Sequence, residues 1–177
     1  MNRILIIVDM QNDFVTGALG SAEAVAAARR LAEKLGAAGG NTAVIFTQDT
    51  HSDDYLATRE GKYLPVAHCI RGTDGWEICP ELREACPAAI RVEKETFGGV
   101  GLVDVVRAIV EANPIEEIEL AGVCTDICVV SNALLLKAHF AELDFSVDAS
   151  CCAGVTPVSH EAALAVMKSC QIDILSN

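Results

Sequence analysis

Cys128 stands where a cysteine can act as a nucleophile. The apolar residues 118–123 predict a buried strand, and residues 125–138 predict a helix directly after it. Thr125 is a candidate N-cap, because its hydroxyl can accept a backbone N–H of the first turn. We therefore expect Cys128 in that turn, where the helix dipole favours the thiolate and unused N–H groups can hold an anion. A thiolate beside N–H donors is half of an acyl-transfer site.

Titratable side chains also follow the other predicted strands: Asp9 after 3–8, Asp49 and His51 after 42–47, and Lys94 after 90–93. The carboxyl ends of the strands in an open α/β sheet share one edge, so these side chains should meet there. Asp49 and His51 lie two residues apart and point to the same side of an extended chain. A carboxylate beside an imidazole suits a divalent metal such as zinc, iron or manganese, although two ligands are too few.

The elements that must position these residues alternate between strand and helix. The predicted strands are 3–8, 42–47, 90–93, 118–123, 144–148 and 172–175, and the predicted helices are 21–35, 100–111, 125–138 and 158–169. Apolar strands alternating with helices are typical of a parallel sheet covered on both faces. Right-handed crossovers then predict an open, doubly wound, Rossmann-like α/β sheet of about six strands. The length of 177 residues fits a single domain, residues 1–177.

Residues 49–89 interrupt this alternation and show no clear helix or strand. A segment of that length without regular structure is uncommon in a compact domain and usually serves a function. It holds His51 and His68, the only tryptophan and both tyrosines. We expect a long loop that contributes to the metal site.

The composition limits the partners of the protein. A net charge of −12 argues against a nucleic-acid surface, and the 51% of hydrophobic residues contain no run long enough for a membrane span. No secretory signal is evident, so we expect a cytoplasmic protein whose eight cysteines are mostly thiols. A small-molecule substrate fits this charge, and the alanine-rich helices suit the interface of a homo-oligomer. His139 is predicted at the surface or in an interface, and His160 is predicted to be structural.

Four motifs lie at the predicted strand ends: VDMQNDF at 8–14, QDTH at 48–51, KETF at 94–97 and GVCTDICV at 122–129. Their order and spacing resemble those of the isochorismatase-like cysteine hydrolases, and within that family the nicotinamidases. The resemblance covers nearly the whole chain. It implies a catalytic triad of Asp9, Lys94 and Cys128. It also implies an oxyanion hole formed by the backbone N–H groups of Cys124 and Cys128, with a cis peptide bond just before Cys124.

The same resemblance implies one divalent metal ion, with zinc preferred over iron or manganese. His68 is the natural third ligand beside Asp49 and His51. The fourth ligand differs within the family and is either a histidine, at the place of Ala57 here, or a glutamate, at the place of Glu60. We therefore choose Glu60, with the acidic residues Asp53 and Asp54 as competitors.

The function implied is hydrolysis of a linear amide C–N bond, converting nicotinamide to nicotinate and ammonia through a cysteine thioester. Apolar walls for the ring are expected from Phe14 and Phe97, with Leu64 and Trp76 as weaker candidates. One alternative is another amidase or carbamoyl hydrolase, or an isochorismatase, of the same family. An alternative of a different class is a catalytically silent protein that binds a metal or a small molecule.

Overall fold

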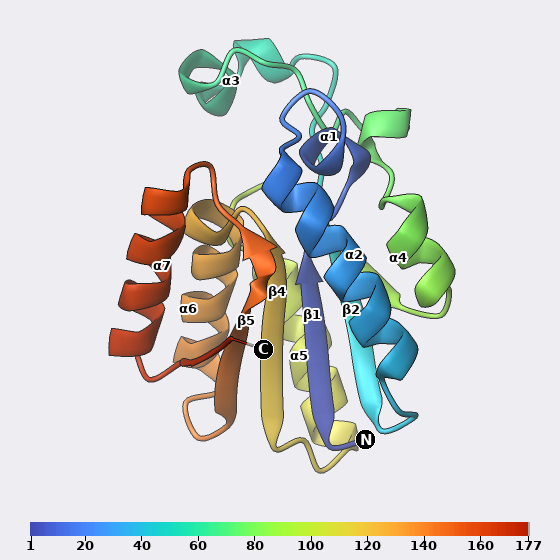
Figure 1. The fold of residues 1–177 in the computed structure, drawn as a ribbon, viewed down its shortest axis with the longest axis vertical. Helices are drawn as coiled ribbons and strands as arrows, with labels where there is room; N and C mark the ends of the chain where they lie inside the picture. Colours follow the sequence, from blue (N-terminus) through green and yellow to red (C-terminus); the bar gives the residue numbers. More distant parts are fainter. Residues whose placement is uncertain (177) are drawn as a thin grey trace.

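The computed structural model describes residues 1–176. Within them, six parallel strands form one sheet in the order β3-β2-β1-β4-β5-β6 (Figure 1). The strands are β1 (Arg3–Val8), β2 (Thr42–Asp49), β3 (Ile90–Lys94), β4 (Glu117–Val123), β5 (Asp144–Ala153) and β6 (Asp173–Leu175). This is the strand order of a doubly wound Rossmann sheet, so the predicted fold class is confirmed.

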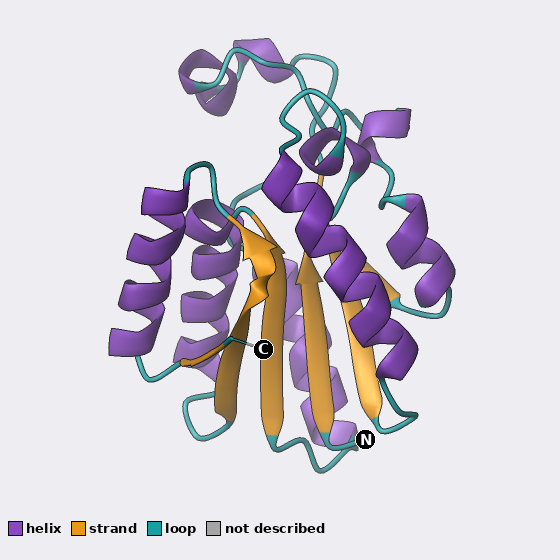
Figure 2. Cartoon of the chain, viewed as in Figure 1, coloured by secondary structure: helices purple, strands orange, loops and turns teal. Residues whose placement is uncertain are grey.

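Helices cover both faces of the sheet (Figure 2). The longer helices are α2 (Ala22–Ala37), α4 (Pro80–Ala85), α5 (Val100–Ala112), α6 (Val130–His139) and α7 (Pro157–Ser169). The helices α2 and α4 pack against each other on one face of the sheet. On the opposite face, α6 packs between α5 and α7. No helix in the part of the chain that the structure describes has the length and apolarity needed to cross a membrane.

The winding of the chain reverses between β1 and β4, and this reversal decides where a site can form. The chain moves outward from β1 through β2 to β3, then returns across the sheet through α5 to β4 on the other side of β1. Right-handed crossovers in the two directions place their helices on opposite faces. A crevice therefore opens beyond the carboxyl ends of β1 and β4, the usual place for a ligand in such a sheet.

The central strand β1 is buried after its first residue, Arg3, which explains the apolar sequence of residues 4–8. The side chains from Ile4 to Val8 are at most 2% exposed, because sheet neighbours flank the strand and helices cover both faces. The chain leaves this strand at Asp9, whose φ of 50° lies in the left-handed region. The end of β1 thus delivers a carboxylate directly to the crevice.

The segment 49–89 contains more regular structure than we expected. Besides α4, it forms η1 (Tyr55–Ala57), α3 (Arg59–Tyr63) and η2 (Asp74–Trp76), and another short helix, α1 (Asn12–Val15), precedes α2. These elements are too short to show a helical repeat in the sequence and depend on local caps, such as the Thr58 side chain that accepts from the N–H of Gly61. Figure 1 shows α3 beyond the carboxyl ends of the strands.

Candidate active site

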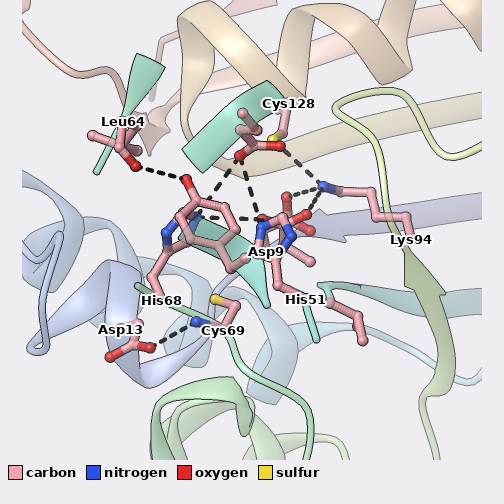
Figure 3. A network of polar contacts seen from close by, with 12 residues as sticks. Asp9, Asp13, His51, Leu64, His68, Cys69, Lys94 and Cys128 are labelled. Atoms are coloured by element: carbon pink, nitrogen blue, oxygen red, sulfur yellow. Dashed lines mark hydrogen bonds and ion pairs between the residues drawn. The ribbon is translucent and has the colours of Figure 1, made fainter. Parts of the chain in front are cut away.

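The predicted triad meets at the carboxyl edge of the sheet. The Nζ atom of Lys94 lies 2.7 Å from Oδ2 of Asp9 and donates a hydrogen bond of 3.5 Å to Sγ of Cys128 (Figure 3). It also lies 3.0 Å from Oδ1 of Asp49, so one ammonium group joins the thiol to two carboxylates. All three triad side chains are buried, and they come from the ends of β1 and β3 and from the turn after β4.

Asp9 is held in place by Thr47, a residue that sequence reasoning missed. The Thr47 hydroxyl donates a 2.6 Å hydrogen bond to Oδ1 of Asp9 and accepts a 3.1 Å hydrogen bond from the backbone N–H of Asp9.

The neighbouring strand β4 approaches the end of β1 closely at Gly122. This glycine lies opposite Val8 in the sheet with a φ of 119°, and a Cβ there would stand 2.2 Å from the Val8 carbonyl oxygen. Only glycine permits that approach of β4 to the end of β1.

Burial determines the protonation of the triad. It raises the pKa of Asp9 above the ordinary carboxyl value, although the Lys94 ammonium acts to lower it. Burial also raises the pKa of Cys128 well above the ordinary thiol value, and the charge of Asp9 adds to this effect. The expectation that Cys128 ionises more readily than a free cysteine is therefore wrong for the resting site. The helix dipole is outweighed by the loss of solvent.

The resting site therefore combines the Cys128 thiol with the buried carboxyl group of Asp9, and both groups contact the Lys94 ammonium. Apart from the ion pair with Lys94, Oδ2 of Asp9 has no hydrogen-bond partner among the described residues. Burial alone would lower the pKa of Lys94, but the adjacent Asp9 carboxylate raises it above its ordinary value. Lys94 therefore favours its charged form beside both the sulfur of Cys128 and the carboxyl group of Asp9.

The turn that carries Cys128 differs from a simple capped helix. Residues Thr125–Val129 form a single π-helical turn ahead of α6, and Cys124 is the N-cap without a side-chain hydrogen bond. The predicted N-cap role of Thr125 is wrong, because its hydroxyl is 2.8 Å from Nδ1 of His160 in α7. His160 thus has the structural contact that we expected. The peptide bond between Val123 and Cys124 is cis, as the resemblance implies.

Asp49, His51, Glu60 and His68 come together beside the triad, each offering a ligand atom within 4.8 Å of the others. Nε2 of His51 lies 3.0 Å from Oδ2 of Asp49 and 3.7 Å from Oε1 of Glu60. Nε2 of His68 lies 3.7 Å from the same Asp49 oxygen, while its Nδ1 is 2.8 Å from the carbonyl oxygen of Val66. That second contact orients the ring so that the Nε2 lone pair faces the cluster, as in protein metal sites.

Of the acidic residues considered for the fourth ligand, α3 places Glu60 in the cluster. Glu60 lies in the first turn of α3 and directs Oε1 to within 4.0 Å of Nε2 of His68. Asp53 and Asp54 are exposed and lie outside the cluster. The two imidazoles and two carboxylates form a nitrogen and oxygen donor set that fits zinc, iron or manganese.

Tyr55 supports this cluster and was not identified from the sequence. Its ring centroid lies 4.6 Å from that of His51 and 4.9 Å from that of His68, and its hydroxyl donates a 3.0 Å hydrogen bond to the Leu64 carbonyl (Figure 3). The ring is fully buried and keeps both imidazoles in place. The position of Tyr55 between the predicted metal ligands His51 and His68 is only a weak sign of this contact in the sequence. Its ring reaches the two histidines because of the way η1 is folded, which has no local pattern.

One pocket of about 460 Å³ is lined both by the Cys128 turn and by the side chains of the candidate metal site. Its lining includes Cys124 and Cys128 together with Asp49, Glu60 and His68. The rest of the lining is mostly apolar and includes all three predicted ring contacts, Phe14, Leu64 and Phe97. Trp76 is absent from this lining, since its indole N–H donates a 2.8 Å hydrogen bond to the Thr50 hydroxyl. The prediction that Trp76 would form part of the wall around the substrate ring is therefore wrong.

Replacing Thr47 with valine should change the pH dependence of the reaction. The Thr47 hydrogen bond lowers the pKa of Asp9, so its loss should raise that pKa further. If Asp9 is the general base that the triad predicts, it acts in its deprotonated form, so the acidic limb of the kcat/KM profile should move to higher pH. Steady-state rates across the pH range measure this shift. An unchanged limb in a folded variant would show that Asp9 does not set it.

Comparison with known proteins places this site in a family. The isochorismatase domain family matches residues 3–177. The nicotinamidase/pyrazinamidase of Mycobacterium tuberculosis is 27% identical over 188 residues, covering 98% of each chain. A nicotinamidase/pyrazinamidase structure from Bacillus subtilis is 28% identical with a TM-score of 0.84, covering 99% of this chain and 100% of that one.

A zinc complex of a pyrazinamidase from Pyrococcus horikoshii is also similar, with 26% identity, a TM-score of 0.84 and full coverage of both chains, 100% of each. These relatives share the length and the fold of the chain from end to end. The family match extends over all six strands and over every motif at the carboxyl edge of the sheet. The chain therefore belongs to the isochorismatase domain family of hydrolases.

Proposed function

We propose that this protein is a metal-dependent amidase that hydrolyses nicotinamide to nicotinate and ammonia. The observation that carries the proposal is one pocket whose lining contains both the Cys128 thiol and the residues Asp49, Glu60 and His68. Nicotinamide carries a group for each of them: a carboxamide for the thiol to attack and a ring nitrogen for a metal ion to bind. The nicotinamidase/pyrazinamidase relatives support the same reaction.

The triad residues would perform the covalent chemistry. As the sulfur of Cys128 attacks the carboxamide carbon, its proton passes to Asp9, which then gives it to the departing ammonia. A thioester remains, and Asp9 activates a water molecule that attacks it, releasing nicotinate and returning the thiol. Lys94 keeps the carboxylate in position through the 2.7 Å contact. The backbone N–H groups of Cys124 and Cys128 are the proposed donors to the oxyanion.

Asp49, His51, Glu60 and His68 would hold one divalent ion, for which zinc is our first choice. When bound, the ion supplies a Lewis acid that orients the pyridine nitrogen and withdraws electron density from the carboxamide. The apolar side chains Phe14, Leu64 and Phe97 would flank the ring and exclude water. The Phe14 ring packs edge-on against His68 at 5.3 Å, so the wall and the cluster support each other.

A pair of matched substrates tests the proposal. Benzamide has the carboxamide of nicotinamide but no ring nitrogen, so it can occupy the pocket without reaching the metal. We expect ammonia release from nicotinamide with kcat/KM at least about 100-fold above that for benzamide, because the site is built around the missing contact. Removing the metal by chelation should abolish the difference, and adding zinc, iron or manganese should restore it.

A panel of substrates, with pyruvate release followed for isochorismate and ammonia release for the amides, separates the alternatives. Faster release from a carbamoyl amide, or turnover of isochorismate, would assign another reaction of the family to the same triad. No turnover of any substrate by the metal-loaded protein would favour a binding protein, which the complete triad argues against. The cytoplasmic location and the homo-oligomer remain predictions, to be measured by fractionation and by light scattering.

A further inference from the structure

Asn132 is a buried polar residue that the mechanism does not use. It lies in α6, one helical turn after Cys128, with no exposed surface. Asparagine is unfavourable in a helix interior, and burying an amide costs free energy unless its hydrogen bonds are formed. The Asn132 amide forms three of its four possible bonds, all to backbone groups.

These bonds join the nucleophile turn to the loop that follows Lys94. The Nδ2 group donates to the carbonyl oxygens of Cys128 at 2.8 Å and Phe97 at 3.0 Å. The Oδ1 atom accepts a 2.8 Å hydrogen bond from the N–H of Gly99. One side chain therefore ties residues 97 and 99 to the segment that carries the reacting sulfur.

Besides the packing of Gly98 near Ser131 and Leu135, hydrogen bonds to Asn132 hold the loop against α6. Among residues 1–176, the hydrogen bonds that link the backbone of Phe97 and Gly99 to α6 both end on Asn132. The bond from the Thr96 hydroxyl to the Gly98 carbonyl stays inside the loop. Phe97 lines the pocket yet is 45% exposed, so burial alone does not fix its ring. Its position depends on the backbone anchor.

We propose that Asn132 is a positioning residue that sets the place of the Phe97 wall relative to the Cys128 thiol and thereby controls affinity for a flat ring. The proposal rests on the proposed function only in assigning a ring-bearing amide to this pocket. Asp9 and Lys94 are held by Thr47 and by each other, without Asn132. Loss of Asn132 should therefore affect binding of the ring more than reactivity of the thiol.

Steady-state kinetics with nicotinamide test the coupling to Phe97. We expect Asn132→Ala to raise KM about tenfold with a much smaller change in kcat, since the loss is of an ordered binding contact. In a Phe97→Ala background the same substitution should add nothing, because residues acting through one contact are not additive. Ser131→Ala, at the neighbouring position of α6, is the control and should leave both constants unchanged. Full additivity, or a fall in kcat with KM unchanged, would overturn the proposal.

A second measurement requires no turnover. Iodoacetamide and iodoacetanilide carry the same reactive carbon, and only the second carries a flat ring. Their reaction with Cys128 forms a carbon–sulfur bond, releases iodide and loses the thiol proton, and mass spectrometry of the Cys128 peptide follows both. In metal-loaded protein, Asn132→Ala should reduce the ratio of the anilide rate to the amide rate about fivefold. An unchanged ratio would contradict the role of Asn132 even if nicotinamide proves not to be the substrate.

Asn132→Ser protects the test against misfolding of the alanine variant. A serine hydroxyl can donate to the carbonyl one turn earlier, so the bond to Cys128 can persist. It is too short to replace the bonds to both Phe97 and Gly99. We expect the serine variant to show the same raised KM and the same lowered rate ratio. Wild-type values of both quantities in this variant would overturn the proposal.

Discussion

Replacing Cys128 with alanine is expected to abolish amide hydrolysis, with the rate falling at least about 10⁴-fold, as for removal of other covalent nucleophiles. The variant keeps the Cys128 backbone N–H but leaves Asp9 with no proton to accept and the carboxamide with no sulfur to attack it. The side chain is buried beside Lys94, so alanine should be accommodated without refolding of the turn. Ammonia release under saturating nicotinamide measures the effect.

The control for this variant is Cys170→Ala, which removes an exposed thiol outside the pocket. It should retain the wild-type rate. Metal content of both variants should equal that of the wild type, because Cys128 is not part of the metal cluster. Substantial activity in the Cys128→Ala protein would exclude the thioester route and point to direct attack by water.

Loss of an imidazole from the metal cluster should have the second-largest effect. We expect His68→Ala to lower metal affinity and nicotinamide hydrolysis by more than about 100-fold, since even residues that only support metal ligands are worth that much. His68 is buried and its Nδ1 is already engaged with Val66, so its Nε2 has no role outside the cluster. Elemental analysis of the purified protein and zinc titration of the metal-free form measure the affinity.

Two carboxylates of the same segment provide a matched pair. Glu60→Gln and Asp54→Asn each remove one negative charge, but only Glu60 lies within the cluster. We expect the first variant to weaken metal binding about tenfold or more, and the second to leave it unchanged. Weaker binding in the Asp54→Asn protein alone would move the fourth ligand away from Glu60. Retained metal with lost activity in Glu60→Gln would instead assign Glu60 to the substrate.

Much of the architecture could be predicted because it depends on local pattern. The apolar run before Asp9 predicts β1, and its burial follows from a central place in a parallel sheet. Lys94 and Cys128 come after strands of the same sheet, so topology alone brings their backbones to one edge. Even Glu60 could be selected, because the family resemblance supplied the spacing.

Other features depend on contacts between segments that are distant along the chain. Thr47 reaches Asp9 only because β1 and β2 pair in a particular register. The hydrophobic pattern of the two strands does not specify that register. Tyr55 packs on two histidines because η1 folds back toward the sheet. Asn132 gains two of its three partners from a loop more than thirty residues earlier. Each of these is a tertiary hydrogen bond or packing contact with no local signature.

The sequence by itself determined the order of the elements and the chemical identity of the groups at the strand ends. Hydrophobic periodicity and motif spacing are properties of the amino-acid sequence and can be recognised without knowledge of how the chain packs. Only the tertiary structure decided the direction in which the pKa of Cys128 is shifted and which residues surround the thiol. The helix position suggested an easily ionised thiol, but burial beside Asp9 raises its pKa, because solvation depends on what the whole fold excludes.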